Sequence, residues 1–157
     1  MNDLDLMNDI IAYIKESFSN DVDFSKIKVE KAYKAENELA TPEIDVYLSD
    51  EGEDIISNSY DNENISIKLL TLYCYNKAMV FGNNESKNDA VESTMILTDR
   101  LKTIMNKNNV SQNNKNIISL TRRSVVPPQD LRDGIIYVSI IRYEIKVLNN
   151  YEKIYNE

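Results

Sequence analysis

The sequence of 157 residues contains no histidine, one cysteine and only three glycines. Without histidine, the commonest general acid or base and the commonest metal ligand are missing. The single cysteine, Cys74, excludes an intrachain disulfide and a zinc site built from several cysteines. Three scattered glycines exclude a glycine-rich phosphate-binding loop. These absences argue against an enzyme, and we predict no catalytic residue, no cofactor and no metal site.

The chain also lacks clustered positive charge and a long apolar run. Its 18 Lys and Arg residues are outnumbered by 26 Asp and Glu residues, so the formal net charge is -8. Binding to a nucleic-acid backbone requires clustered Lys and Arg, and a membrane helix requires about 20 apolar residues in a row. The first residues lack the cationic and apolar stretches of a signal peptide. We therefore expect no membrane segment, no specific nucleic-acid binding and a chain made in the cytoplasm.

Two segments have apolar residues at helical spacing, and we predict a helix in each. In residues 3–19 these are Met7, Ile10, Ile11, Ile14 and Phe18. In residues 86–107 the spaced positions are Ala90, Thr94, Leu97, Leu101 and Ile104. Ser86 is the expected N-cap of the second helix, because Asp89 follows three residues later.

Alternating apolar residues predict five strands, over residues 27–33, 42–48, 64–76, 117–126 and 134–148. We expect the first two strands to form one hairpin and the last two another. Three polar features separate the elements: an acidic loop at 49–63, a linker at 106–116 and a strand break at Pro127-Pro128. This order predicts an α+β fold, in which two helices pack on one face of a mostly antiparallel sheet of about five strands. Residues 1–157 are expected to form a single domain with a short polar tail at 149–157.

Two of the predicted strands are unusually long. Ordinary strands have ~5 to 6 residues, whereas residues 134–148 would reach roughly 50 Å at ~3.3 Å per residue. A compact domain of this length has a radius of gyration of only about 15 Å. Part of each long strand should therefore extend beyond its own core or bend across it. Such apolar strands indicate a subunit that completes its burial against copies of itself.

Charge is unevenly distributed along the chain. Residues 36–63 contain ten acidic residues and no basic one, whereas residues 100–132 contain seven basic residues and only Asp130 as an acid. A head-to-tail contact between copies would pair these segments and close into a ring or run on as a filament. Alternatively, the segments pair within one monomer or are solvated. The candidates for an inter-subunit or partner interface are Asp50, Glu51, Glu53, Asp54, Asp61, Glu63, Arg122, Arg123 and Arg132.

The two adjacent arginines carry a further expectation. Successive side chains of a strand point to opposite faces, so Arg122 and Arg123 cannot serve the same site. We expect each of them to pair with an acidic side chain.

The order of elements resembles that of the tail terminator, or tail-completion, proteins of long-tailed bacteriophages and of headless phage-tail-like particles. The resemblance covers nearly the whole chain. Members of this family often carry Trp in the long middle strand, where this chain has Tyr73 and Tyr75. The matching stretches are the helix at 6–18, the strand TPEIDVYL at 41–48, the strand ISIKLLTLY at 65–73, the helix at 90–104 and the closing strand at 135–147.

The resemblance implies a subunit of a ring, typically a hexamer, that caps the tail tube and stops its polymerisation. The ring would offer a docking surface to the neck of the head and, in a contractile tail, to the sheath. It implies a place in a virion or phage-tail-like particle assembled in the host cytoplasm, where DNA passes through the lumen without specific binding. A head-tail connector ring is the alternative function, and a small monomeric binding module or enzyme is a third.

Overall fold

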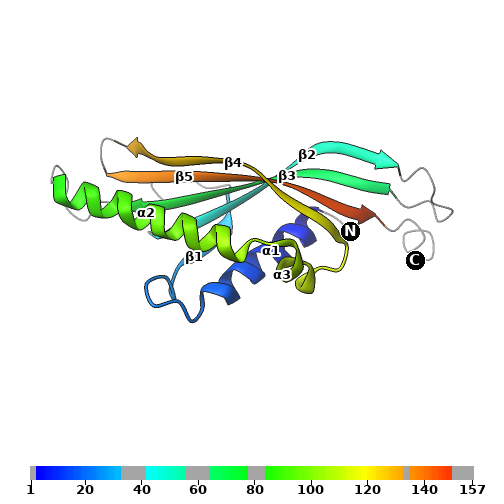
Figure 1. Ribbon diagram of the computed structural model, residues 1–157, viewed down its shortest axis with the longest axis horizontal. Coiled ribbons are helices and arrows are strands. Elements are labelled where there is room, and N and C mark those ends of the chain that lie inside the picture. Colours follow the sequence, from blue (N-terminus) through cyan, green and yellow to red (C-terminus); the bar gives the residue numbers. More distant parts are fainter. Residues whose placement is uncertain (1–2, 33–41, 56–63, 78–83, 133–134, 150–157) are drawn as a thin grey trace.

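The computed structural model describes residues 3–32, 42–55, 64–77, 84–132 and 135–149. Within these residues, five strands form one mixed sheet in the order β1-β2-β3-β5-β4, and three helices lie on one side of it (Figure 1). The expected α+β class is confirmed, with one more helix than predicted. The elements are α1 (Asp3–Phe18), β1 (Lys28–Lys31), β2 (Glu43–Ile55), β3 (Asn64–Lys77), α2 (Asn84–Ile104), α3 (Lys107–Asn113), β4 (Ile117–Arg132) and β5 (Ile136–Asn149).

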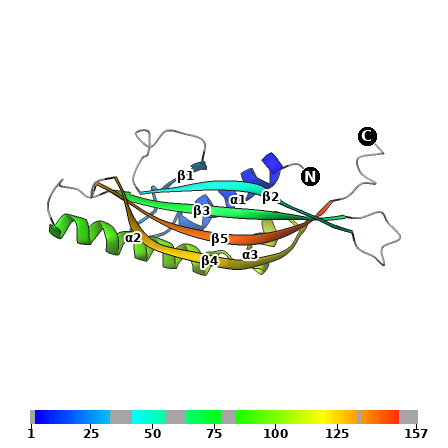
Figure 2. The same ribbon diagram turned by 90° about the horizontal axis from the view of Figure 1, so that it is seen from above.

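The two strands predicted to be long form the centre of the sheet, but the prediction of only two long strands is wrong, because β2 has 13 residues and β4 has 16. β3 and β5 pair antiparallel along their whole length, from Asn64 opposite Asn149 to Lys77 opposite Ile136. Figure 2 looks onto the sheet, with β2, β3, β5 and β4 side by side. The paired ends of β2 and β3 reach past the helices (Figure 1). The prediction that part of a long strand extends beyond the helix-covered core is confirmed.

One hydrophobic core lies between the sheet and the helices. α1 packs against β1 and β2, α2 against β3 and β5, and α3 against β4. The buried side chains of α1 have the predicted helical spacing. Asp3 and Asp5 in its first turn stabilise the helix because they lie at the positive end of its dipole. The core side chains of the three central strands are Ile44, Val46, Leu48, Leu70, Leu72, Cys74, Ile141, Tyr143, Ile145 and Val147.

The predicted hairpin at the start of the sheet is wrong. β1 and β2 are neighbours, but they pair parallel, with Lys28 opposite Glu43 and Lys31 opposite Val46. Apolar alternation identifies the two faces of a strand and contains no information on its direction. The eleven residues between Lys31 and Glu43 are close to the length that a parallel connection requires. The predicted hairpin at the end of the sheet is confirmed, because β4 and β5 pair antiparallel.

The predicted linker at 106–116 contains a helix, α3. Asn106 is its N-cap, and the Asn109 amide donates a hydrogen bond of 3.0 Å to the Asn106 side chain. Val110 is the one buried residue of this helix. A seven-residue helix with a single apolar anchor has no period to detect, which is why the sequence pattern missed it. The cap at Ser86 is also wrong, because α2 begins at Asn84.

The acidic loop and the proline break need correction as well. Residues 49–55 belong to β2, which pairs with β3 as far as Ile55 opposite Asn64. Residues 56–63 of the predicted loop lie outside the described residues, as does all of the predicted tail except Asn149, which ends β5. β4 runs through Pro127-Pro128 to Arg132, with a register shift between Val126 and Gln129. Proline is tolerated here because β4 is an edge strand and the irregular register requires no amide donor.

Candidate interaction surfaces

The acidic candidates lie on and beyond the end of β2. Asp50 of β2 forms an ion pair with Lys68, the residue opposite it on β3. Lys68 also lies 3.0 Å from Asp3 at the start of α1, and its side chain is only 14% exposed. Partial burial lowers the pKa of Lys68, but its hydrogen bonds to Asp50 and Asp3 outweigh burial and raise that pKa. Lys68 therefore ties β3 to both β2 and α1 within one chain.

Three of the other acidic candidates lie on a described strand, and two do not. Glu51, Glu53 and Asp54 lie on the last part of β2, around the register shift between Asp50 and Gly52. Asp61 and Glu63 lie outside the described residues.

The basic candidates lie on β4, at the edge of the sheet. Arg123 forms an ion pair with Glu144 of β5, as expected. Arg122 is exposed and lies opposite Tyr143, and no carboxylate within the described part of the chain is close enough to form an ion pair with it. Burial raises the pKa of Tyr143 to about 12, although the charge of Arg122 opposes the rise. Arg132 is the last residue of β4, ten residues further along the edge.

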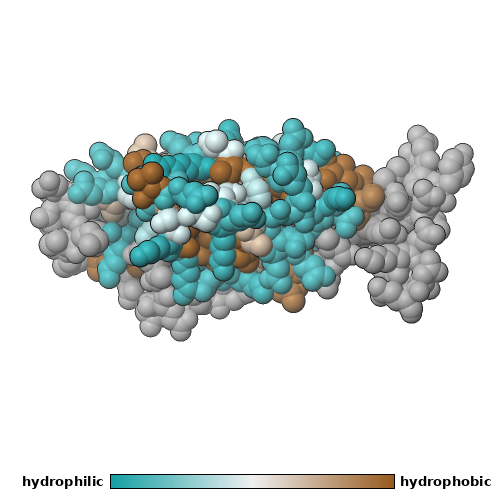
Figure 3. All heavy atoms as spheres, turned by 90° about the horizontal axis from the view of Figure 1, so that it is seen from below, coloured by the Kyte–Doolittle hydropathy of each residue, from teal (hydrophilic) through white to brown (hydrophobic). Residues whose placement is uncertain are grey.

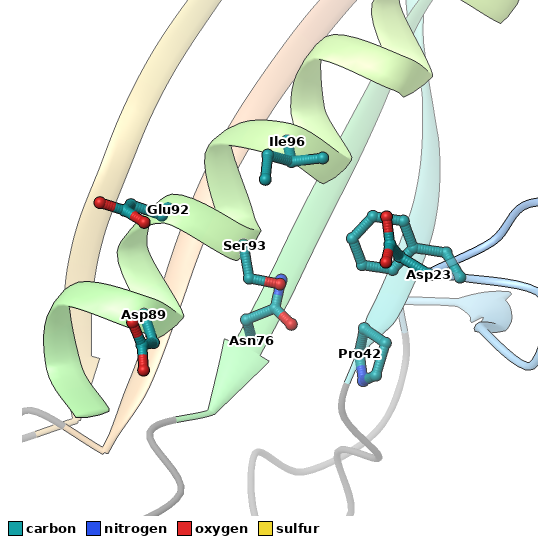
Figure 4. Close-up of a pocket in the computed structure, with 8 residues that line it drawn as sticks. Asp23, Pro42, Asn76, Asp89, Glu92, Ser93 and Ile96 are labelled. Carbon is teal, nitrogen blue, oxygen red and sulfur yellow. The ribbon is translucent and has the colours of Figure 1, made fainter. Parts of the chain in front are cut away.

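A pocket of about 400 Å³ opens between α2 and the neighbouring ends of β2 and β3 (Figure 4). Four separate segments build it, none of which was predicted to be part of a site. Its lining residues are Asp23, Phe24, Pro42, Asn76, Asp89, Glu92, Ser93 and Ile96.

Asn76 is the polar group at the bottom of this pocket. It is 6% exposed, and its side-chain Nδ2 makes no hydrogen bond to any described residue. Its amide points toward Ser93 of α2 (Figure 4). A buried donor without an acceptor costs about 1 to 3 kcal/mol, so Asn76 Nδ2 favours a ligand that brings an acceptor oxygen into the pocket.

One wall of the pocket is held by Arg100 of α2. Its guanidinium contacts Asp21 at 2.6 Å and Asp23 at 2.8 Å, and it lies 5.3 Å from the centre of the Phe24 ring. Burial raises the pKa of Asp21, but hydrogen bonds from the amides of Asp23 and Phe24 and the charge of Arg100 outweigh it and lower that pKa. These contacts position the turn after α1, which supplies Asp23 and Phe24 to the pocket.

A second buried polar contact lies beneath α2, and we interpret it as structural. Thr98 of α2 hydrogen bonds to Ser139 of β5, and Cys74 of β3 lies beside both. Burial raises the pKa of the Cys74 thiol to about 12, so it stays protonated at neutral pH and is a poor nucleophile.

Two elements, α2 and β4, each carry more than one exposed apolar side chain. Met95 and Ile96 of α2 are 51% and 45% exposed, and Ile96 borders the pocket. Figure 3 views the molecule from below, where hydrophobic groups are scattered over a largely hydrophilic surface. On β4 the exposed apolar residues are Ile118, Val125 and Leu131. The acidic pocket and the basic edge strand thus each have apolar neighbours.

Two classes of feature have no counterpart in the described part of the chain. No group of three or more Cys, Asp or Glu side chains there is arranged to hold a metal ion. Among the same residues, no helix combines the length and the apolar character needed to cross a membrane. In comparisons with known proteins, no family model matches the sequence, and a search of curated proteins finds no match.

Proposed function

We propose that this chain is a structural subunit of a phage tail or phage-tail-like particle. In this proposal, copies of the chain assemble into a ring, typically of six, on the last ring of the tail tube. One face of the ring matches the tube subunits, while the opposite face lacks the surface that a further tube ring needs. Tube polymerisation therefore stops, and the free face becomes the docking surface for a neck or, in a contractile tail, a sheath.

The main support is the shape of the sheet. Four of its five described strands have 13 to 16 residues, and the paired ends of β2 and β3 extend past the helices (Figure 1). A projecting antiparallel pair offers a strand edge to a neighbour, which suits a subunit that is completed by assembly. The resemblance in element order to tail terminator proteins gives this assembly its proposed place.

Charge supports the same proposal. The acidic end of β2 and the basic edge strand β4 lie at different places on the subunit. A contact between unlike surfaces is the kind that closes into a ring, and complementary charge would set its register. The ring would function in the particle after assembly in the cytoplasm of the bacterial host. Any DNA in its lumen would meet an acidic chain and pass without specific binding.

The decisive experiment is deletion of the gene from the producing strain, followed by electron microscopy of its particles. We expect tubes of uncontrolled, abnormally long length, and restoration of normal length by the full chain supplied in trans. Tubes of normal length with unattached heads would favour the head-tail connector ring instead. Normal, infectious or active particles would overturn both structural functions.

A further inference from the structure

The pocket beside Asn76 has the chemistry of a binding site for a cation. Three carboxylates line it, and Arg100 pairs with only one of them, Asp23. Asp89 and Glu92 are exposed on α2, and neither has an ion-pair partner within the described residues. A ligand with a guanidinium or ammonium group would be attracted to these two carboxylates.

Asn76 adds a second requirement. Its Nδ2 is a donor, 6% exposed and without an acceptor among the described residues, so it cannot bind a guanidinium or ammonium, which only donates. It requires an acceptor oxygen, which a carbonyl, a carboxylate or a hydroxyl can supply. The ligand that satisfies both conditions is a peptide segment, in which a main-chain carbonyl lies close to a basic side chain.

The chain itself carries such a segment in β4. Arg122 is exposed and has no carboxylate partner in the described part of the chain. β4 is an edge strand, so carbonyls on its outer side have no strand partner among the described residues. Val125, three residues along the same strand, is 38% exposed, and it could cover Ile96 at the border of the pocket.

The irregular shape of β4 excludes the simplest alternative contact. Its pairing with β5 shifts register at four places, and it contains Pro127-Pro128. Bulges and prolines on an edge prevent continuous pairing with the strand of another molecule. A neighbour must therefore use side chains and single carbonyls of β4, which is what the pocket accepts.

We propose that the pocket receives the β4 edge of a second copy of this chain. The Arg122 guanidinium of that copy lies between Asp89 and Glu92, and a main-chain carbonyl beside it accepts a hydrogen bond from Asn76 Nδ2. This inference rests on the proposed ring function, and it identifies the two unlike surfaces that meet in the ring.

The test measures self-association of the full chain by sedimentation equilibrium over a range of concentrations. We expect Arg122→Glu to weaken association by about tenfold or more, as for loss of a buried charged contact. Arg123→Gln is the matched control, because its side chain already pairs with Glu144 within the same chain, and it should change association less than twofold. Combining Arg122→Glu with Asp89→Arg and Glu92→Arg should restore association.

Asn76→Leu separates a binding role from a structural one. Leu has nearly the same shape and removes the unsatisfied donor, so the monomer should become more stable. Association should nevertheless weaken, since the carbonyl of the neighbour loses its partner. A purely structural Asn76 would change both quantities in the same direction.

Each result has a definite meaning. If the wild-type chain associates and the Arg122, Asp89 and Glu92 variants associate equally well, the pocket is not the contact, and the ring function stands. If the wild-type chain stays monomeric at every concentration, the pocket contact is overturned, and the deletion experiment alone decides the ring function. Mixed copies carrying Ser93→Cys or Arg122→Cys should form an interchain disulfide, and no cross-link would also count against the contact.

Discussion

The two faces of the central strands are built from the same segments, yet they have different environments. On the face toward the helices, Leu70, Leu72 and Cys74 of β3 are fully buried. On the other face, Leu69, Tyr73 and Tyr75 are partly exposed, and no helix within the described residues lies there (Figure 1). The inner face therefore provides most of the hydrophobic stabilisation, and the outer face is available for other contacts.

The outer face nevertheless has order of its own. The rings of Tyr73 and Tyr75 stack with centroids 6.3 Å apart and planes inclined by 16°. Val138, which lies opposite Tyr75, is only 7% exposed. The alternation of apolar residues along β3 and β5 is equally strong on both faces. By itself it does not tell which face stabilises the fold.

The largest difference should come from truncating one leucine on each face. Leu72→Ala removes a fully buried side chain and should lower the free energy of unfolding by about 2 to 5 kcal/mol. Leu69→Ala, three residues away on the outer face, should cost less than about 1.5 kcal/mol because Leu69 is partly exposed. Urea unfolding followed by circular dichroism measures both. Equal losses would show that the outer face is as important to stability as the core.

Alkaline pH should lower the free energy of unfolding because the Cys74 thiol is buried. The pKa of its thiol is 9.0 in an ordinary environment and about 12 in the fold. Above pH 9.0 the unfolded chain therefore binds fewer protons than the folded one, and stability falls as pH rises. The loss should approach about 1.4 kcal/mol per pH unit between 9 and 12, with Tyr143 adding to it above pH 10. Unfolding curves at pH 8 and pH 10 test this.

A variant at position 74 provides the control for the alkaline effect. Cys74→Val removes the titrating group, so the fall in stability between pH 9 and pH 10 should nearly disappear. An unchanged slope in the variant would assign the effect to other residues.

Lys68 should have a smaller effect, at the end of the inner face. Lys68→Met keeps much of the aliphatic stem but loses the contacts to Asp50 and Asp3, so we expect a loss of about 1 kcal/mol, the upper end for such ion pairs. Added salt should reduce the difference between variant and wild type. A variant as stable as wild type at low salt would mean that these contacts contribute nothing.

The smallest effect belongs to the ion pair on β4. Arg123 is 55% exposed, and Arg123→Gln should change the free energy of unfolding by less than about 0.5 kcal/mol. Thermal unfolding at low and high salt would detect any larger contribution. A loss above 1 kcal/mol would show that this surface pair is more strongly coupled to the sheet than its exposure suggests.

Much of the element structure could be predicted from local patterns. α1 and the long strands β3 and β5 begin and end within two residues of the predicted bounds, because each carries many apolar residues at one period. α3 could not be found this way, since it has one buried residue and depends on the Asn106 cap. The strand continuation through residues 49–55 depends on backbone pairing with β3, which acidic side chains do not indicate.

The candidate site was much less predictable. The predicted interface residues were chosen from charge along the chain, and two of them, Asp50 and Arg123, form ion pairs within one chain. The pocket residues Phe24, Asn76 and Asp89 come from separate segments and have no shared motif. Their proximity depends on how α2 and the turn after α1 pack on the sheet, which no local pattern records.

By itself, the sequence determined the class of the fold, the buried faces of its main elements and the uneven distribution of charge, because these depend on period and composition. The parallel pairing of β1 with β2, the bulged edge at β4 and the pocket around Asn76, whose Nδ2 has no acceptor among the described residues, all depend on the tertiary structure. These features depend on contacts between residues that are distant in the chain, and the energy of such contacts exists only once the elements have packed.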